Sequence, residues 1–158
     1  MRQGARHCGV KSFRSILLGA ALVAVFCVSS ASAKTGWLTD YKQAQQEAKA
    51  SGKLLLVDFT GSDWCGWCIR LDREVFSKPE FQEYAKKNLI LLEVDFPRTK
   101  EISVDQRKQN EQLAREYQIE GFPTLVVLNG DGKTVGMLGY TPGGPSAFIA
   151  ELGKLPKG

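Results

Sequence analysis

A pair of cysteines separated by two residues follows a strongly apolar run of the chain. The run covers residues 54–59, and the pair stands in the motif Trp64-Cys65-Gly66-Trp67-Cys68. A Cys-x-x-Cys pair at the end of a strand and the start of a helix has the arrangement that disulfide exchange requires. The unpaired N–H groups and the dipole at a helix N-terminus lower the pKa of an attacking thiol, and the second thiol lies close enough to resolve a mixed disulfide. The motif therefore predicts a strand–loop–helix unit with a redox-active dithiol.

The first 33 residues predict a secretory signal peptide that is removed from the mature protein. They begin with four basic side chains and no acidic one, continue with an apolar run over residues 16–28, and end in Ala31-Ser32-Ala33. This apolar run is shorter than the roughly 20 residues that span a bilayer, and the small residues fit a cleavage site. We expect cleavage after Ala33 and a periplasmic or secreted domain over residues 34–158. An uncleaved membrane anchor is the alternative.

Removal of this leader changes what the composition implies. Four of the 21 basic side chains and none of the 17 acidic ones lie in the leader, so the remaining domain is formally neutral. A neutral domain argues against a nucleic-acid partner. Cys8, Cys27 and His7 also lie in the leader, which leaves two cysteines and no histidine in the mature domain.

The absence of histidine from the mature domain excludes several kinds of site. A Ser-His-Asp or Cys-His catalytic site and a two-cysteine, two-histidine zinc site both require it. A four-cysteine zinc site shared by two chains stays open as an alternative, as does a purely structural disulfide. A bridge from Cys65 to Cys68 closes so small a loop that the chain-entropy gain is only about 2 kcal/mol, which favours redox chemistry. We expect no metal, and no cofactor other than a redox-active disulfide.

Helices and strands alternate in the predicted order of elements. Strands are expected over residues 54–60, 89–95 and 124–129, followed by a hairpin turn at Asn129-Gly130-Asp131-Gly132 into a strand over residues 134–140. Helices are expected over residues 37–51 with Thr39 as N-cap, from Cys65 to Val75, from a Ser77-x-x-Glu80 capping box to Lys87, over residues 100–117, and from Pro145 onwards. Strands separated by helices predict parallel pairing, to which the final hairpin adds antiparallel strands. The expected fold is a small mixed α/β sheet with helices on both faces.

Three separated motifs resemble the thioredoxin superfamily, over roughly residues 53–155. Val57-Asp58-Phe59 leads to the cysteine motif, Gly121-Phe122-Pro123-Thr124 resembles the cis-proline loop of the family, and the turn at residues 129–132 with Gly139 resembles its terminal hairpin. The run from Phe59 to Cys65 is most similar to exported bacterial thioredoxin-like proteins of the disulfide reductase and isomerase type. The resemblance implies a thioredoxin fold and a thiol–disulfide oxidoreductase. Its partners would be protein thiols and disulfides, with a membrane or periplasmic redox partner.

The resemblance also implies roles for individual residues. Cys65 is similar to the family's nucleophile and Cys68 to its resolving thiol. Pro123 resembles the cis-proline opposite the motif, with an ordinary loop proline as the alternative, and Phe122 would offer backbone groups to an extended substrate. We expect substrate to be bound by Trp64, Gly66, Trp67, Phe122, Pro123 and Tyr140. Trp67 and Tyr140 are expected to be exposed, and at least one of the other aromatic residues to pack in the core.

Asp58 is the one charge in its predicted strand, where burial should raise the pKa of its carboxyl group. In thioredoxins a buried aspartate on this strand assists proton transfer to or from the resolving cysteine, and the resemblance implies the same role here. A structural aspartate paired with a lysine or a backbone N–H is the alternative. Leu91 stands where many thioredoxins place a lysine beside this aspartate, and Gly66-Trp67 replaces their usual Gly-Pro. The direction of exchange therefore cannot be carried over.

Two other functions compete with disulfide exchange. The first is a non-catalytic binding or chaperone module that keeps its disulfide locked and uses the aromatic rim expected around Cys65, formed by Trp64, Trp67, Phe122 and Tyr140. The second is a peroxidase, which the sequence disfavours because peroxide-reducing relatives place their cysteine in a different setting. The long charged connection over residues 96–117 has no role that the sequence predicts.

Overall fold

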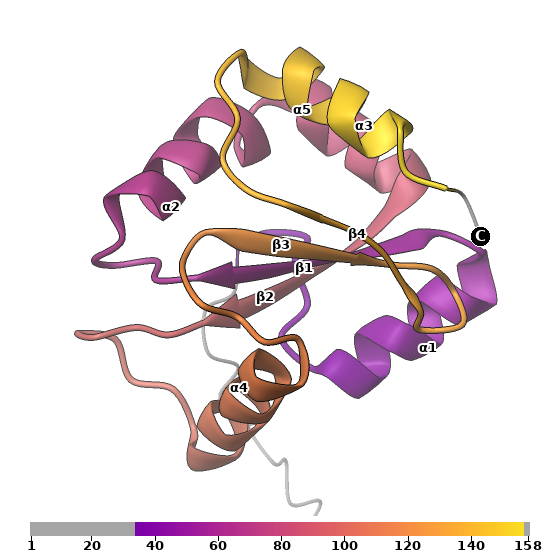
Figure 1. Cartoon of the computed structure of the whole chain (residues 1–158). Coiled ribbons are helices and arrows are strands. Elements are labelled where there is room, and N and C mark those ends of the chain that lie inside the picture. The colour runs from indigo at the N-terminus through magenta and orange to yellow at the C-terminus, as the bar shows by residue number, and fades with distance from the viewer. Residues whose placement is uncertain (1–33, 157–158) are drawn as a thin grey trace, which may run out of the picture.

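The computed structural model describes residues 34–156, so the predicted leader lies outside the described part of the chain (Figure 1). The elements follow one another as α1 (Tyr41–Ser51), β1 (Leu54–Thr60), α2 (Gly66–Leu71), η1 (Asp72–Phe76), α3 (Pro79–Asn88), β2 (Leu89–Asp95), α4 (Val104–Glu116), β3 (Thr124–Leu128), β4 (Thr134–Leu138) and α5 (Gly144–Gly153). Within residues 34–156, no helix is long and apolar enough to cross a membrane.

The four strands form one mixed sheet in the order β2-β1-β3-β4. β1 and β2 are parallel, as predicted for strands joined through helices, and β3 and β4 form the predicted antiparallel hairpin. β3 is antiparallel to β1, which the expected parallel pairing of helix-separated strands did not foresee. The physical reason is that the chain returns from α4 at the end of the sheet where β1 and β2 finish. Thr124 therefore pairs with Phe59, and Pro123 lies beside the carboxyl end of β1.

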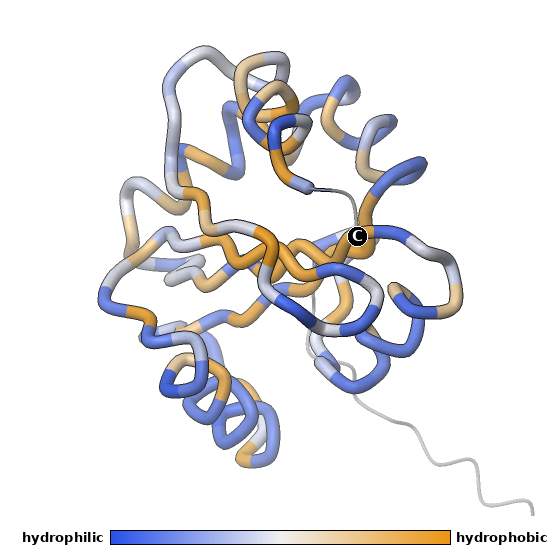
Figure 2. Tube along the Cα trace, turned by 45° about the vertical axis from the view of Figure 1, so that its right-hand side comes forward, coloured by the Kyte–Doolittle hydropathy of each residue, from blue (hydrophilic) through white to orange (hydrophobic). Residues whose placement is uncertain are grey.

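Side chains of each strand alternate between two apolar layers. α2, α3 and α5 cover one face of the sheet, and α1 and α4 lie on the other (Figure 1). Leu56 packs in the layer below α3 and α5, whereas its neighbours Leu55 and Val57 pack in the layer of α1. The central strands are the most hydrophobic part of the trace, and α4 is largely hydrophilic (Figure 2). Asp58 follows Leu56 on the same face, so its carboxyl group points toward α2.

The first helix begins later than the predicted residue 37. Asp40 is the N-cap and accepts a hydrogen bond from the Gln43 N–H at 2.7 Å, so the prediction of Thr39 as N-cap was wrong. The reason is that Leu38 pairs with the free edge of β2, donating from its N–H to Leu91 and accepting from the N–H of Glu93, each at 2.9 Å. This pairing fixes the segment before α1 against the sheet.

Three other helix boundaries differ from the predictions. α2 ends at Leu71 and continues as the π-helical turn η1, which Ser77 closes by donating from its N–H to the Asp72 carbonyl at 2.8 Å. The capping box at Ser77 is absent, because Lys78 is the N-cap of α3 and the Ser77 hydroxyl donates to the Arg73 carbonyl. α4 begins only after Ser103, whose hydroxyl caps it. β3 and β4 each end one or two residues before the predicted bound.

Candidate active site

Cys65 and Cys68 form a disulfide at the junction of β1 and α2. Their Cα atoms lie 5.2 Å apart. The Gly61 carbonyl accepts from the N–H groups of Trp64 and Cys65, which turns the chain sharply after the strand. Cys65 is the N-cap of α2, and its sulfur accepts from the Cys68 N–H at 3.2 Å. In the reduced protein the same N–H would favour a thiolate at Cys65.

Pro123 follows a cis peptide bond with Phe122, as the resemblance implied. The pairing of Thr124 with Phe59 carries this loop to the end of β1, next to the turn that holds the cysteines. The ring of Phe122 meets the indole of Trp64 edge to face, with centroids 6.0 Å apart. The cysteine loop and the cis-proline loop are therefore in contact through their aromatic side chains.

The predicted aromatic rim divides into two groups, one around Trp64 and one around Trp67. Trp64 contacts Phe122, whose ring stacks on Phe96 at 5.2 Å. Trp67 contacts Tyr140, with ring centroids also 5.2 Å apart. Trp67 is 55% exposed, as expected. Tyr140 is less accessible than expected, because it is half-buried and its hydroxyl donates to Glu74 at 2.7 Å.

Each tryptophan beside the cysteines also lies under an arginine. The guanidinium of Arg98 is 3.9 Å from the centre of the Trp64 ring, and that of Arg70 is 5.5 Å from the Trp67 ring. Such cation–π contacts contribute about 0.5–1 kcal/mol at exposed sites. Trp64 is further fixed because its Nε1–H donates to the Phe96 carbonyl at 2.8 Å. Sequence reasoning missed both arginines, which carry no motif.

The loop after β2 is tied to the cysteine loop by the carboxylate of Asp63. This group accepts from the N–H groups of Arg98, Thr99 and Lys100 and from the Thr99 hydroxyl, at 2.6–3.2 Å. The Thr99 hydroxyl and the Arg98 N–H hold the pKa of Asp63 below its usual range. Part of the long connection after Phe96 therefore has a place in the site, which its sequence did not predict.

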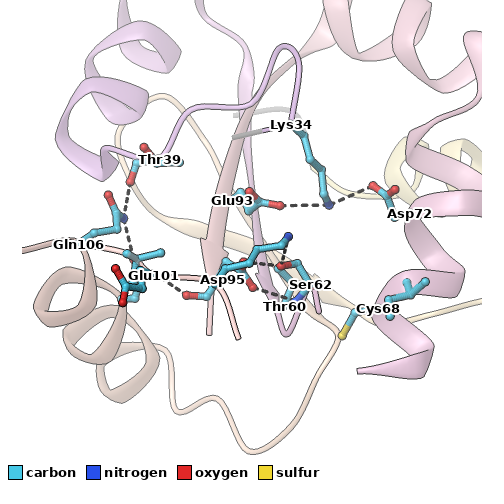
Figure 3. Close-up of a pocket in the computed structure, with 14 residues that line it drawn as sticks. Lys34, Thr39, Thr60, Ser62, Cys68, Asp72, Glu93, Asp95, Glu101 and Gln106 are labelled. Atoms are coloured by element: carbon cyan, nitrogen blue, oxygen red, sulfur yellow. Dashed lines mark hydrogen bonds and ion pairs between the residues drawn. The ribbon is translucent and has the colours of Figure 1, made fainter. Parts of the chain in front are cut away.

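A charge cluster lies under the disulfide, with the ammonium group of Lys34 at its centre. The Lys34 nitrogen is 3.1 Å from Asp72, 3.4 Å from Glu93 and 3.5 Å from Asp58. Figure 3 shows the Lys34 side chain extending between Glu93 and Asp72, with Cys68 on the neighbouring helix. Asp58 is fully buried, and its second carboxylate oxygen has no hydrogen-bond partner among the described residues.

Burial and the charges of neighbouring side chains together set the pKa values in this cluster. It raises the pKa of Asp58 to about 7, because the nearby Lys34 only partly offsets the desolvation of the carboxylate. Burial also raises the pKa of Glu93, again against the effect of Lys34. Burial lowers the pKa of Lys34, but its three carboxylate neighbours outweigh that effect and the net shift is upward. Asp58 can therefore exchange a proton near neutral pH.

The lysine beside Asp58 reaches it from an unexpected place. Leu91 pairs with Leu56 in the apolar layer, and Lys34 supplies the cation from the segment before α1. Sequence reasoning missed Lys34, Glu93 and Asp72. The sequence did carry a signal for Glu93, because β1 and β2 each have seven residues with an acid at the fifth position. Parallel pairing in register places Asp58 beside Glu93.

A pocket of about 510 Å³ opens next to Cys68 and the charge cluster (Figure 3). Lys34, Glu93 and Asp72 line one part of it, and the hydroxyls of Thr60 and Ser62 line another. The pocket gives solvent a route to Cys68 and to the charge cluster. Among residues 34–156, no group of three histidine, cysteine, aspartate or glutamate side chains is arranged to hold a metal ion.

The amino-acid sequence over residues 41–155 matches the family described as a thioredoxin-like domain, so the chain belongs to that family. The predicted thioredoxin fold is thereby confirmed. The fold and the Cys65–Cys68 disulfide define a thiol–disulfide oxidoreductase, whose redox group is the cysteine pair itself.

Individual relatives agree with this class. Disulfide bond reductase DsbH of Chlamydia pneumoniae is 35% identical over 122 residues, which cover 77% of this chain and 73% of that protein. Thioredoxin-related protein DsbJ of the same organism is 30% identical over 103 residues, which cover 65% of this chain but 30% of that protein. A solved structure described as DsbH oxidoreductase superposes with a TM-score of 0.70 at 32% identity, covering 85% of this chain and 92% of its own.

Proposed function

We propose that the protein is an exported enzyme that reduces disulfide bonds in other proteins through Cys65 and Cys68. The observation that carries this proposal is the cysteine pair at the N-terminus of α2, joined to the cis-proline loop and placed above a buried acid. The reducing direction is supported by the printed name of the C. pneumoniae relative, a disulfide bond reductase. Because Gly66-Trp67 replaces the usual Gly-Pro between the cysteines, the reduction potential of the pair does not follow from the resemblance and is the quantity to measure.

The proposed reaction is thiol–disulfide exchange in two steps. The Cys65 thiolate attacks one sulfur of a substrate disulfide, so that a mixed disulfide forms and the other substrate sulfur leaves as a thiolate that takes a proton. Cys68 then gives its proton to the Asp58 carboxylate and attacks the Cys65 sulfur, which releases the second substrate thiolate. Two electrons pass from the cysteine pair to the substrate. The pair ends as the disulfide of the present structure, and an external dithiol must reduce it again.

The proposed substrate surface surrounds Cys65. Trp64 and Trp67 are 37% and 55% exposed, and they offer apolar area to a partly unfolded segment. The backbone at Phe122 and Pro123 would pair with an extended substrate next to the cysteine. Gly66 lies between the two cysteines, and no residue outside its own turn comes within 4 Å of the position that a Cβ would take, so a substrate chain can approach there. Tyr140 would support Trp67 from beneath.

Replacing Cys68 by alanine tests the first step of the proposal. The variant should accumulate mixed disulfides through Cys65, because the resolving thiol is missing. Non-reducing electrophoresis and mass spectrometry of the exported protein would show these adducts, and the matched control is the Cys65→Ser, Cys68→Ala double variant. A native compartment without Cys65-dependent adducts would contradict the proposed activity.

The reduction potential of the Cys65–Cys68 couple tests the direction of exchange. Equilibration with glutathione buffers should give a value near that of thioredoxin, about −270 mV, rather than the roughly −120 mV of a strong oxidant. An oxidising value would overturn the reductase assignment but leave the exchange chemistry intact. A disulfide that no glutathione buffer opens would instead favour the non-catalytic binding module.

Export itself is proposed from the leader. We propose cleavage after Ala33 and a periplasmic or secreted location, supported by the basic start, the apolar run and the small residues. N-terminal sequencing of the exported protein tests this, since Lys34 should be its first residue. Protein thiols and disulfides are the proposed substrates, and a membrane or periplasmic thiol protein would return the pair to the reduced state.

A further inference from the structure

Lys34 joins three carboxylates that come from three different elements. Asp58 lies on β1, Glu93 on β2 and Asp72 at the start of η1, and the ammonium nitrogen is within 3.1–3.5 Å of an oxygen of each. Lys34 itself precedes α1 and lies outside the residues that match the family, which begin at 41. The charge balance under the disulfide therefore depends on a residue that precedes the part of the chain matched to the family.

The side chain of Lys34 is held in this position by more than charge. Its ammonium group lies 4.9 Å from the centre of the Trp37 ring and 5.3 Å from that of Phe76. Its carbonyl accepts from the Trp37 N–H at 2.9 Å, and Leu38 pairs with the edge of β2. Trp37 is buried in the apolar layer of α3 and α5. Backbone pairing, aromatic packing and ion pairs thus direct Lys34 into the cluster.

Asp58 needs this cation more than its partners do. Asp72 is partly exposed, with 40% of its side chain accessible, and Glu93 is buried but lines the pocket. Asp58 is fully buried, and one of its oxygens has no hydrogen-bond partner among the described residues. An ionised carboxylate in such a place is costly unless a cation lies close to it. Lys34 is the cation that the structure places there.

Three charged side chains act on Asp58 from different elements. Lys34 faces it from the segment before α1, Glu93 from β2 and Asp72 from η1. Asp95 and Lys100 act on Glu93 with opposite signs. The two acids that face Asp58 favour its protonated form, and Lys34 opposes both. Removing Lys34 must therefore raise the pKa of Asp58, whereas removing Glu93 or Asp72 must lower it.

We propose that Lys34 is a positioning residue of the exchange reaction, whose ammonium group favours the ionised form of the Asp58 carboxylate, the form that accepts the proton of Cys68. The inference rests on the proposed function, because it assigns a residue to the second step of that reaction. It extends the active site to the segment before α1. The part of Lys34 is electrostatic, since Asp58 rather than Lys34 receives the proton.

The test is the pH dependence of the second step in single-turnover reduction of a disulfide-bonded peptide between pH 5 and 9. Loss of the mixed disulfide and release of the second peptide thiol report on Cys68. In Lys34→Met the midpoint should move upward by roughly one to three pH units, because a carboxylate loses its neighbouring cation. Near pH 7 the step should slow at least about fivefold and recover at higher pH. Lys34→Arg should restore the midpoint, and Lys42→Met on the exposed face of α1 is the matched control.

A second variant tests the sign of the electrostatic argument. Asp72→Asn removes an acid that favours the protonated form of Asp58, so the midpoint should move downward by less than the shift in Lys34→Met. Asp72 is partly exposed, so this variant also provides the test if Lys34→Met does not fold. An unchanged or raised midpoint in Asp72→Asn would count against the proposal.

The failure of this inference can be told apart from the failure of the proposed function. If wild-type protein forms and resolves the mixed disulfide but the Lys34→Met profile overlays it, the role of Lys34 is wrong and the exchange activity stands. If wild-type protein forms no mixed disulfide through Cys65, the proposed function fails first. If Lys34→Arg behaves like Lys34→Met, the positive charge alone does not explain the effect and the proposal is overturned.

Discussion

Gly61 decides how closely the cysteine loop can fold back at the end of β1. A Cβ built at this residue would lie 2.5–2.8 Å from the indole of Trp64, closer than atoms of two side chains approach. The same indole donates to the Phe96 carbonyl and packs against Phe122. Because Gly61 has no side chain, the indole of Trp64 fits against it and connects its own loop with the loops of Phe96 and Phe122.

Gly61→Ala should accordingly displace Trp64 and destabilise the protein by about 1–3 kcal/mol, as overpacking at a tight contact does. Chemical denaturation measures the loss, and tryptophan fluorescence should shift in the folded state. Gly153→Ala is the matched control, because a Cβ there meets no atom within 4 Å. Equal stability of Gly61→Ala and wild-type protein would show that the indole can move at no cost.

The site residues differ in how far the sequence could predict them. Cys65, Cys68 and Pro123 were expected from local motifs, and the structure shows the disulfide and the cis bond. Asp58 stood out because a charge in an apolar strand is unusual. Lys34 gave no signal, since its three partners are distant in the sequence and it lies in no helix or strand. Long-range ion pairs of this kind depend on the register of elements that a local pattern does not determine.

At the scale of elements, the loop from Phe96 to Ser103 owes its position to one carboxylate. Asp63 accepts three backbone N–H bonds and one hydroxyl bond from this loop, and Arg98 then lies over Trp64. The loop has no regular secondary structure of its own over these residues. Its order should therefore depend on the cysteine loop to which it is attached.

Asp63→Ala should release this loop while leaving the sheet intact. Limited proteolysis should cut within residues 96–103 several-fold faster, because local opening controls cleavage. Asp63→Asn should give an intermediate rate, since an amide oxygen can still accept some of the bonds. Asp131→Ala in the β3–β4 turn is a control for a general loss of charge. A cleavage pattern unchanged from wild type would show that other contacts hold the loop.

The strands were easier to predict than the helix ends. β1 and β2 have the predicted bounds because each is a short apolar run interrupted by polar residues. The start of α1 was missed because Leu38 pairs with β2, a tertiary contact that overrides helical spacing. The π turn after Leu71 was missed because one extra residue per turn leaves little trace in the hydrophobic pattern. The direction of β3 depends on where α4 returns the chain.

For the whole molecule, the buried Asp58 makes stability depend on pH. The pKa of its carboxyl group is about 7 in the folded protein and near 3.8 when exposed, so folding takes up a proton between these values. Below about pH 4 the group is protonated in both states and costs nothing. Between about pH 4 and 7 the exposed carboxyl group of the unfolded state ionises while the buried one stays protonated, so the free energy of unfolding falls, by up to about 4 kcal/mol once the pH is above 7.

Asp58→Asn should remove this dependence. The variant should resemble wild-type protein near pH 4 and exceed its free energy of unfolding by a few kcal/mol at pH 8. Urea denaturation of the oxidised proteins measures the difference without interference from titrating thiols. Asp40→Asn at the N-cap of α1 is the control outside the cluster. A wild-type protein that becomes more stable relative to the variant as pH rises would contradict the assigned direction.

The segment before α1 decides how far the chain can be shortened without losing part of the site. Cutting the chain at residue 41, where the family match starts, would keep the disulfide, the cis-proline and every strand. It would also remove Lys34 and Trp37, so that Asp58 and Glu93 would share a buried site without their cation. Such a fragment could fold and carry an intact cysteine pair yet react slowly at neutral pH. Its low activity would reflect the missing Lys34 rather than a defect in the cysteine pair.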